Sequence, residues 1–251
     1  MIGGIIALAI AAIGAAYAGL VLRSAPHRRD NLVFGALALT DAAMTAWRGL
    51  NVLAGEHIVD SAVAIPCSVC TIVLAVLTIE FLAAFPRRAP MRWRWRALVL
   101  VWSAGGATML IAAVPLVYSQ WLYFAPITFV TFGVGVFAFR RTKERDARTV
   151  IAMLWFRWAF GFFAYFVAPR FGFYESAVWA ETTFATLVSF IVIGTAVLRN
   201  ELFSVRSSAA EAIVIATIAL VVVLCGGGAI WLVQTYTTPG YARQLPPSIF
   251  R

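Results

Sequence analysis

Apolar residues run along this chain in blocks of about 20, and short polar segments separate the blocks. A helix needs about 20 consecutive apolar residues to cross the hydrocarbon core of a bilayer, so each block is a candidate span. The pattern predicts an all-α fold, a polytopic transmembrane helix bundle of about eight spans. The expected spans cover residues 2–22, 32–54, 62–85, 97–117, 120–139, 147–168, 176–198 and 210–233.

The first block, "MIGGIIALAIAAIGAAYAGLVLR", lacks the basic start of a signal peptide and is longer than the apolar core of one. We therefore expect it to remain as the first span. The order of the blocks predicts seven spans within 1–206 and an eighth transmembrane helix over 207–234. The last residues, 235–251, carry prolines and a glycine, which predicts an extended tail.

The composition also indicates a membrane protein, because 62% of the residues are hydrophobic, 12% are charged and the mean hydropathy is +0.88. Ordinary soluble domains are about 45–50% apolar and about 25% charged. A chain this apolar cannot cover its surface with polar groups, so lipid is the expected solvent for most of it. We expect an integral membrane protein, located in a bacterial cytoplasmic membrane.

The basic residues are concentrated in alternate polar segments. Those after the first, third, fifth and seventh spans hold Arg23, Arg28, Arg29, Arg87, Arg88, Arg92, Arg94, Arg96, Arg140, Arg141, Lys143, Arg145, Arg148, Arg199 and Arg206. Lysine and arginine accumulate on the cytoplasmic side of membrane proteins. These four segments are therefore expected inside the cell, which places the N-terminus and the tail outside.

The stretch "FPRRAPMRWRW" interleaves arginine with tryptophan, a pattern also found in nucleic-acid grooves. About ten residues between two spans do not supply a folded basic face, so we expect no nucleic-acid partner. At a bilayer surface, tryptophan sits at the headgroup level and arginine meets lipid phosphate. The predicted interface anchors are Arg92, Trp93, Arg94, Trp95 and Arg96. The formal net charge of +9 is then mainly a signal of topology.

Four charged residues fall inside predicted spans, where ionisable groups are costly and usually face a partner or the bundle interior. Asp41 and Arg48 are seven residues apart in the second span, so two helical turns bring them to one face. Arg157 in the sixth span matches the depth of Asp41, and Glu181 in the seventh span matches the depth of Arg48. We predict two separate ion pairs, Asp41–Arg157 and Arg48–Glu181.

Three interpretations of these charges are open: the pairs hold the bundle in register, they line a polar ligand or proton site, or the pairing is wrong. An exchange of the charges of Asp41 and Arg157 is expected to restore the expression that either single change loses. Glu80 lies near the inner surface, where it is expected to reach Arg87 or Arg88 or to extend to the headgroups.

Several chemistries are not expected. The histidines, His27 and His57, both lie in polar segments, so no span offers an axial ligand for haem. The one lysine, Lys143, also lies outside the spans, which excludes a retinal Schiff base within them. Cys67 and Cys70 share a helix face but lack further metal ligands, so we predict no metal site and no catalytic residues. No cofactor is predicted, although a bound lipid or quinone remains open.

The sixth span is rich in aromatic residues on all sides of the expected helix. They are Trp155, Phe156, Trp158, Phe160, Phe162, Phe163, Tyr165 and Phe166. Packing against lipid and other helices is one explanation of this composition. An aromatic-lined pocket for an apolar ligand or a quinone is the other.

Two junctions carry a family resemblance: "TIEFLAAFPRRAP" after the third span and "AVLRNELFSVRSS" after the seventh. They resemble the membrane sensor module of the seven-transmembrane histidine-kinase N-terminal family, with its Phe-Pro-basic turn and its Arg-x-x-Leu-Phe exit. The matching residues are Phe85, Pro86, Arg87, Arg88, Arg199, Leu202 and Phe203. The resemblance implies a seven-helix sensor module over about 1–206.

The chain also departs from that family, whose module feeds a cytoplasmic kinase or another output domain. Here an eighth span is expected instead, with no ATP-binding region after it. The chain is then either a fragment or a module that works with other membrane or cytoplasmic subunits. We expect a non-catalytic, sensor-like membrane module that binds a ligand or a partner. An accessory subunit of a respiratory or photosynthetic complex, or a small transporter, is the alternative.

Overall fold

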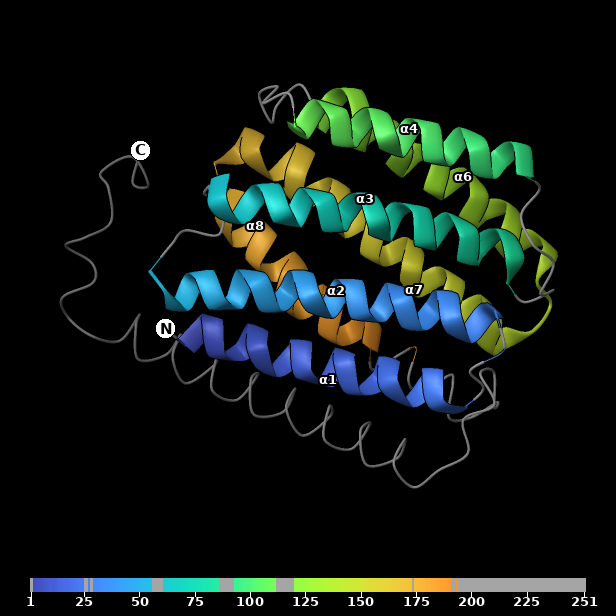
Figure 1. Ribbon diagram of the computed structural model, residues 1–251, viewed down its shortest axis with the longest axis horizontal. Coiled ribbons are helices and arrows are strands. Elements are labelled where there is room, and N and C mark those ends of the chain that lie inside the picture. Colours follow the sequence, from blue (N-terminus) through green and yellow to red (C-terminus); the bar gives the residue numbers. More distant parts are fainter. Residues whose placement is uncertain are drawn as a thin grey trace.

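The computed structural model describes residues 2–24, 27, 29–55, 61–85, 93–111, 120–172, 174–190 and 193, and every regular element in them is a helix (Figure 1). The first half contains α1 (Ile2–Ser24), α2 (Arg29–Leu53), α3 (Ser61–Ala84) and α4 (Trp93–Ile111). In Figure 1 these four helices lie side by side along the long axis of the molecule. The all-α prediction is confirmed for this part of the chain.

The described residues of the second half form three more helical segments, each with an irregular turn. A π-helical turn, η1 (Gln120–Phe124), leads into α6 (Ala125–Arg141). The next rod, α7 (Arg145–Phe162), continues through the π-helical turn η2 (Phe163–Val167) and the 3-10 turn η3 (Ala168–Phe171). The last rod starts as α8 (Tyr174–Ala180), widens into the π-helical turn η4 (Glu181–Ala185) and stays helical through 186–190.

Helices α1 and α2 approach each other closely because glycines face each other at one point. A Cβ on Gly4 would lie 2.7 Å from the carbonyl oxygen of Gly49, and a Cβ on Gly49 would lie 3.0 Å from the carbonyl oxygen of Gly4. Small residues at such positions let two helix backbones come together in a membrane, where the hydrophobic effect between helices is absent. This contact sets α2 firmly against α1 and turns the opposite face of α2 toward α3 and α7.

The largest apolar cluster joins five helices. Tyr17 and Val21 of α1 meet Phe34 of α2, Phe81 of α3 and Ile151 of α7, and each of these side chains is almost fully buried. Ala138 of α6 packs into the same cluster. The cluster lies toward the C-terminal end of α1 and α3, so the bundle is tightly packed there.

The connection between the last two rods depends on a proline and a glycine. Pro169 has no backbone N–H to continue the helix, and the chain tightens into the 3-10 turn η3. Gly172 follows with a φ of 79°, a left-handed conformation that favours glycine, and its N–H bonds to the carbonyl oxygen of Pro169 at 3.3 Å. The reversal brings α8 back along η2 and α7.

Four described helices are long and apolar enough to cross a membrane. They cover Gly3–Arg23, Ile65–Ala83, Leu122–Arg141 and Arg145–Phe171. Most of the predicted span boundaries differ from the observed helix ends by a few residues. The predicted eighth span over 207–234 and the tail over 235–251 lie outside the described residues, as do the ends of the fourth and seventh predicted spans.

At one end of the bundle, Glu80 of α3 forms ion pairs with Arg29 of α2 and Arg96 of α4; we call these three residues the basic rim. The expected partners Arg87 and Arg88 lie outside the described residues. Next to the rim, Arg141 of α6 donates to the carbonyl oxygens of Leu82 and Phe85 at 3.0 and 3.1 Å. It thereby satisfies acceptors that the C-terminus of α3 leaves without helical partners.

The predicted interface anchors lie at the start of α4. Helix α4 begins at Trp93, so Trp93, Arg94, Trp95 and Arg96 belong to its first turn. Arg96 forms an ion pair with Glu80 of α3, and its side chain is 35% exposed, so its contact with lipid stays a prediction. Arg92 and the side chains of Trp93, Arg94 and Trp95 are outside the described set, so their anchoring role stays a prediction.

Candidate functional site

The middle of α2 presents two charged side chains to the bundle interior. Asp41 lies at the midpoint of the helix and Arg48 two turns further on, and their exposed fractions are 6% and 2%. Thr45 lies between them and is also buried. The seven-residue spacing therefore puts both charges on one face, as the sequence predicts.

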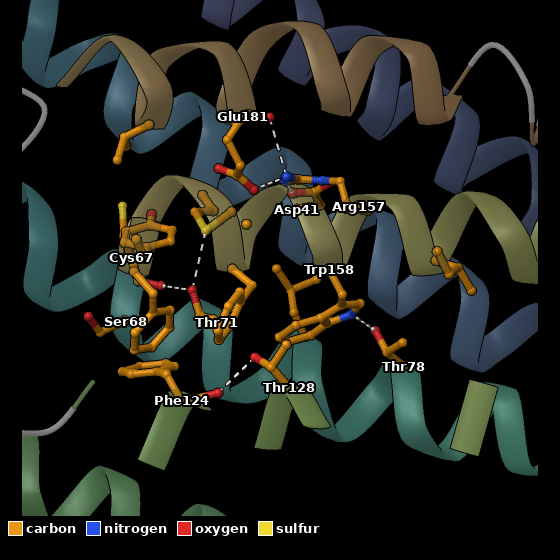
Figure 2. A pocket seen from close by; sticks show the side chains of 18 of the residues that line it. Asp41, Cys67, Ser68, Thr71, Thr78, Phe124, Thr128, Arg157, Trp158 and Glu181 are labelled. Carbon is orange, nitrogen blue, oxygen red and sulfur yellow. Dashed lines mark hydrogen bonds and ion pairs between the residues drawn. The ribbon is translucent and has the colours of Figure 1, made fainter. Parts of the chain in front are cut away.

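Arg157 of α7 meets Asp41 from the opposite side. Its Nη2 lies 2.8 Å from Asp41 Oδ1. Its Nη1 pairs with the carboxylate of Glu181 and donates to the backbone carbonyl oxygen of Glu181 at 3.3 Å. Figure 2 shows the guanidinium between the two acidic side chains. The predicted Asp41–Arg157 pair is present in the structure.

Arg48 uses all three of its nitrogens. Nη1 lies 3.2 Å from Glu181 Oε2 and also donates to the hydroxyl of Thr182. Nη2 donates to the hydroxyl of Tyr165, and Nε donates to Cys67 Sγ at 3.2 Å. The predicted Arg48–Glu181 pair is therefore present, with three further partners that compensate for the water that Arg48 loses on burial.

The two predicted pairs are not separate, because Glu181 contacts both arginines. The four residues form one chain, Asp41–Arg157–Glu181–Arg48, which we call the charge network. It joins α2 to α7 and η4 and carries two positive and two negative formal charges, so it is neutral overall. Buried charges are tolerated when they are paired and hydrogen-bonded, and this arrangement provides both.

Two members of this region lie in π-helical turns. Tyr165 is in η2 and Glu181 begins η4. Single π-helical turns interrupt α-helices frequently at functional sites. Here the backbone carbonyl oxygen of Glu181 accepts from Arg157 Nη1 and, at 3.4 Å, from the hydroxyl of Thr186. The irregular turn thus contributes backbone as well as side-chain acceptors to the charge network.

A cavity of about 120 Å³ lies against the charge network, and all four network residues line it. Its other walls come from α3, α6, α7, η2 and α8. The aromatic part of the lining is Phe124, Trp158, Phe162, Tyr165, Phe166 and Tyr174. The aliphatic and sulfur-containing part is Leu37, Met44, Cys67, Leu74, Leu154 and Val178. One wall of the cavity is therefore charged, and the remainder is mainly apolar.

Most polar groups on the apolar side already have partners within the protein. Thr71 donates to the carbonyl oxygen of Cys67 at 2.8 Å, and Thr128 donates to that of Phe124 at 2.7 Å. Trp158 Nε1 donates to Thr78 Oγ1 at 3.3 Å, as Figure 2 shows. These bonds occupy the donors, so they are not available to a molecule in the cavity without the loss of an existing bond.

Among the described residues, two polar atoms of the charge network have no hydrogen-bond partner. Arg157 Nε is buried without an acceptor. Asp41 pairs through Oδ1 alone, which leaves Oδ2 without a donor. Both residues line the cavity. The carboxylate oxygen Asp41 Oδ2 is therefore the acceptor that the network leaves unpaired, whereas the Arg157 Nε–H is enclosed by protein atoms.

The aromatic residues of α7 and η2 divide into two sets. Trp158, Phe162, Tyr165 and Phe166 line the cavity, whereas Phe156 and Phe163 have exposed fractions of 36% and 39%. Each of the two explanations of this aromatic segment thus accounts for part of it. The outward set is placed to contact lipid, and the inward set forms a pocket wall.

Sequence reasoning missed three partners of Arg48: Cys67, Tyr165 and Thr182. Arg157, Gly161 and Tyr165 follow one another at four-residue intervals, which places them on one helix face and could have linked Tyr165 to the site. Cys67 is the first residue of the "CSVC" motif, whose role here is to accept a hydrogen bond from Arg48. Within the described ranges, no group of three histidine, cysteine, aspartate or glutamate side chains could hold a metal ion.

No protein-family model matches the sequence, and neither a curated protein nor a solved structure matches it. The resemblance to histidine-kinase sensor modules therefore stays a prediction. Of the residues that carry it, Phe85 lies in the described part of the chain, where it stacks on Phe81 with ring centroids 4.6 Å apart.

Proposed function

We propose that this chain is a non-catalytic, sensor-like membrane module that binds a small ligand inside its helix bundle. The observation that carries the proposal is the cavity of about 120 Å³ with the charge network on one wall. Binding pockets are mostly apolar with a few converging polar groups, and this cavity has that composition.

If the charge network only held the helices together, no cavity would be needed beside it. Gly161 of α7 lines it, and a Cβ at that position would meet Glu181 Oε1 at 3.9 Å and no other heavy atom within 4 Å. A larger side chain would therefore fit there and fill space that glycine leaves open. Protein interiors are normally close-packed, so an open space beside buried charges favours a ligand site.

A ligand in this cavity would contact α2, α3, α7 and η4 at once. The charge network connects α2 to α7 and η4, so a change in the network would shift these helices relative to one another. A sensor needs two arrangements whose balance a ligand shifts through its different affinity for each. In this proposal a partner protein reads the rearrangement, and the chain itself catalyses no reaction.

For topology we propose about eight spans with the N-terminus outside, in a bacterial cytoplasmic membrane. Helix α2 counts as a span because its central charges are paired inside the bundle. The basic rim and Arg141 cluster at one end, which supports a cytoplasmic position for that end. Reporter fusions after residues 27, 56, 90, 118, 143 and 173 should alternate in location, beginning inside the cell. Two successive fusions on the same side would refute this topology.

The ligand-binding proposal is tested by filling the cavity. Gly161→Leu adds a side chain there, Gly161→Ala raises helix propensity with little filling, and Gly133→Leu changes an exposed glycine of α6 that has no neighbour within 4 Å. Mass spectrometry of small molecules extracted from the proteins, purified in a mild detergent, should find one species with wild type and with both control variants. That species should be depleted in Gly161→Leu. An identical set of molecules in all four proteins would contradict the proposal.

One observation favours the alternative of an accessory subunit. Helix α4 exposes Leu98, Leu100, Val101 and Trp102, and these side chains form a broad apolar surface. Lipid or a neighbouring subunit would cover such a surface. Native mass spectrometry of the protein in nanodiscs distinguishes the two, because an accessory subunit should carry a stoichiometric second protein and a free-standing module should not.

A further inference from the structure

We infer that Met44, Cys67 and Cys70, which we call the sulfur cluster, form a binding site for the soft monovalent metal ion Cu(I) between α2 and α3. The inference goes beyond the proposed function and does not depend on which molecule occupies the cavity. Three observations carry it: the packing of the three sulfur-bearing side chains, the free state of both cysteines, and the hydrogen bond from Arg48 to one of them.

The sulfur atoms of the cluster come from two neighbouring helices. Met44 of α2 and Cys67 of α3 are 3% and 4% exposed, and Cys70 packs against them. Cys67 and Cys70 are three residues apart, a spacing that puts their Cβ atoms about 5–6 Å apart on one helix face. Between them in sequence, Thr71 Oγ1 lies 3.8 Å from Met44 Sδ after the next turn begins. The thioether therefore lies against the part of α3 that carries both thiols.

The kind of ligand selects the metal. Thiolate and thioether sulfur are soft ligands and suit Cu(I). Zinc usually takes four ligands from cysteine, histidine and carboxylates, and within the described residues no third side chain of these kinds joins the two thiols. The prediction of no metal site rests on this shortage, and it leaves out the thioether that the fold brings to Cys67 and Cys70.

The charge of the ion is balanced at the site. A metal ion binds the deprotonated form of cysteine, so binding releases the protons of both thiols and forms two metal–thiolate bonds without a change of oxidation state. One Cu(I) and two thiolates carry one net negative charge, which is costly inside a membrane bundle unless a donor faces it. Arg48 Nε already donates to Cys67 Sγ at 3.2 Å, and this N–H stabilises the coordinated thiolate.

The cavity gives the ion a route to the sulfur cluster. Met44 and Cys67 both line it, and Cys70 keeps part of its surface exposed. The thioether of methionine is held on a flexible side chain, so it adjusts to an ion without movement of the helices. Sulfur-bearing side chains also serve as plain packing residues, and a metal titration separates the two roles.

The experiment titrates Cu(I), supplied as its coloured bicinchoninate complex, into the reduced full chain purified in detergent without oxygen. Loss of colour reports the Cu(I) that the protein removes. Wild type should remove about one Cu(I) per chain, and an excess of Zn²⁺ should not displace it. Cys67→Ser and Cys70→Ser should each lose this binding. Cys225→Ser is the matched control, because Cys225 lies outside the described residues and should not contribute.

X-ray absorption at the copper edge identifies the atoms around the ion. Wild type should show about three sulfur neighbours, and Met44→Leu should show about two and retain Cu(I) more weakly. Met153→Leu is the control for this change, because Met153 belongs to α7 and packs against a different apolar cluster. Its spectrum should match that of wild type.

The wild-type titration and spectrum decide the inference even if a cysteine variant does not fold. Failure of wild type to remove Cu(I) would show that the sulfur cluster only packs the two helices. Nitrogen or oxygen neighbours in place of sulfur, or unchanged binding in folded Cys70→Ser, would overturn the site. Displacement of Cu(I) by Zn²⁺ would overturn the choice of metal.

Discussion

The charge network and the basic rim use the same kinds of residue in two different surroundings. In the network, the side chains of Arg48 and Glu181 are 2% and 7% exposed, and Arg48 has four partners. In the rim, the carboxylate of Glu80 is shared by Arg29 and Arg96, whose side chains are 44% and 35% exposed. The side chain of Glu80 is 12% exposed, as is that of Arg157 in the network, so the contrast lies in the rim arginines, which retain contact with the surroundings.

The sign and spacing of charges therefore do not by themselves reveal their role. A buried pair has lost its water and must be fully satisfied, so removal of one member leaves an uncompensated charge. An exposed pair contributes little because solvent replaces the lost partner. The network is therefore expected to control stability and binding, and the rim mainly orientation in the membrane. The following variants test that contrast.

The largest effect is expected from Arg48→Met, which keeps much of the side-chain length and removes the charge. Glu181 would lose one cation, and Tyr165 and Thr182 would lose their charged donor. The free energy of unfolding should fall by about 3–5 kcal/mol. Reversible unfolding in mixed micelles measures this change, and Arg29→Met in the rim is the control, with a loss of about 0–1 kcal/mol. Equal losses in the two variants would remove the contrast.

A double-mutant cycle between Asp41→Asn and Arg157→Gln is expected to give a coupling energy of about 1–3 kcal/mol. The same cycle between Glu80→Gln and Arg29→Gln should give about 0.2–1 kcal/mol. The full charge exchange is a poorer test than the sequence alone indicates, because Arg157→Asp would place a carboxylate against Glu181. We therefore expect the exchanged double variant to recover expression only in part. Complete recovery of expression would show that Arg157 does not pair with Glu181 as well as with Asp41.

Removal of single hydroxyl groups is expected to give smaller losses of stability, which still differ between bonds to a charged donor and bonds between neutral groups. Tyr165→Phe removes an acceptor of the charged donor Arg48, which is expected to cost about 1.5–3 kcal/mol. Tyr123→Phe removes a neutral bond to Ser103 at 3.3 Å, which is expected to cost about 0.5–1.5 kcal/mol. Thermal unfolding of the two variants in one detergent measures the difference. A cost for Tyr165→Phe no greater than that of Tyr123→Phe would argue that Arg48 does not need this partner.

The smallest effect concerns salt. At about 0.01 M ionic strength the screening length is about 30 Å, and at 1 M it is about 3 Å. The destabilisation by Glu80→Gln should therefore decrease as salt is raised through this range, because the rim is partly exposed. The destabilisation by Asp41→Asn should stay constant, because that carboxylate is buried. Unfolding of both variants over the salt series checks this, and parallel curves would contradict it.

The helical rods could be predicted from the sequence because apolar blocks of about 20 residues have few other stable forms in lipid. The partners Asp41–Arg157 and Arg48–Glu181 could also be predicted, since matched depth and opposite charge leave few choices for a buried ion. Both rules depend on local pattern and on the cost of burying a charge.

The joining of the two pairs could not be predicted in this way. It depends on Glu181 lying at the start of a π-helical turn, where its side chain reaches Arg48 and Arg157 at once. The pairing of Glu80 with Arg29 and Arg96 could not be predicted either, because these arginines approach it from two neighbouring helices. Contacts of this kind depend on helix rotation and packing, which the linear pattern leaves open.

The sequence contains only an indirect indication of the cavity. The four-residue spacing of Arg157, Gly161 and Tyr165 indicates a shared face, but a glycine on such a face predicts close packing as readily as an open space. The distance of 3.9 Å from a Cβ on Gly161 to Glu181 Oε1 decides between them. Packing across helices therefore determines the candidate site, and the sequence determines which groups are available to it.

The most direct test is the location of a small aromatic molecule bound to the protein. Crystals of the protein grown with bromobenzene, measured at the bromine absorption edge, would mark the molecule by its anomalous signal. One main bromine peak is expected inside the cavity that the charge network and Trp158 line. A clear map with peaks at the lipid-facing surface and none in the cavity would contradict it.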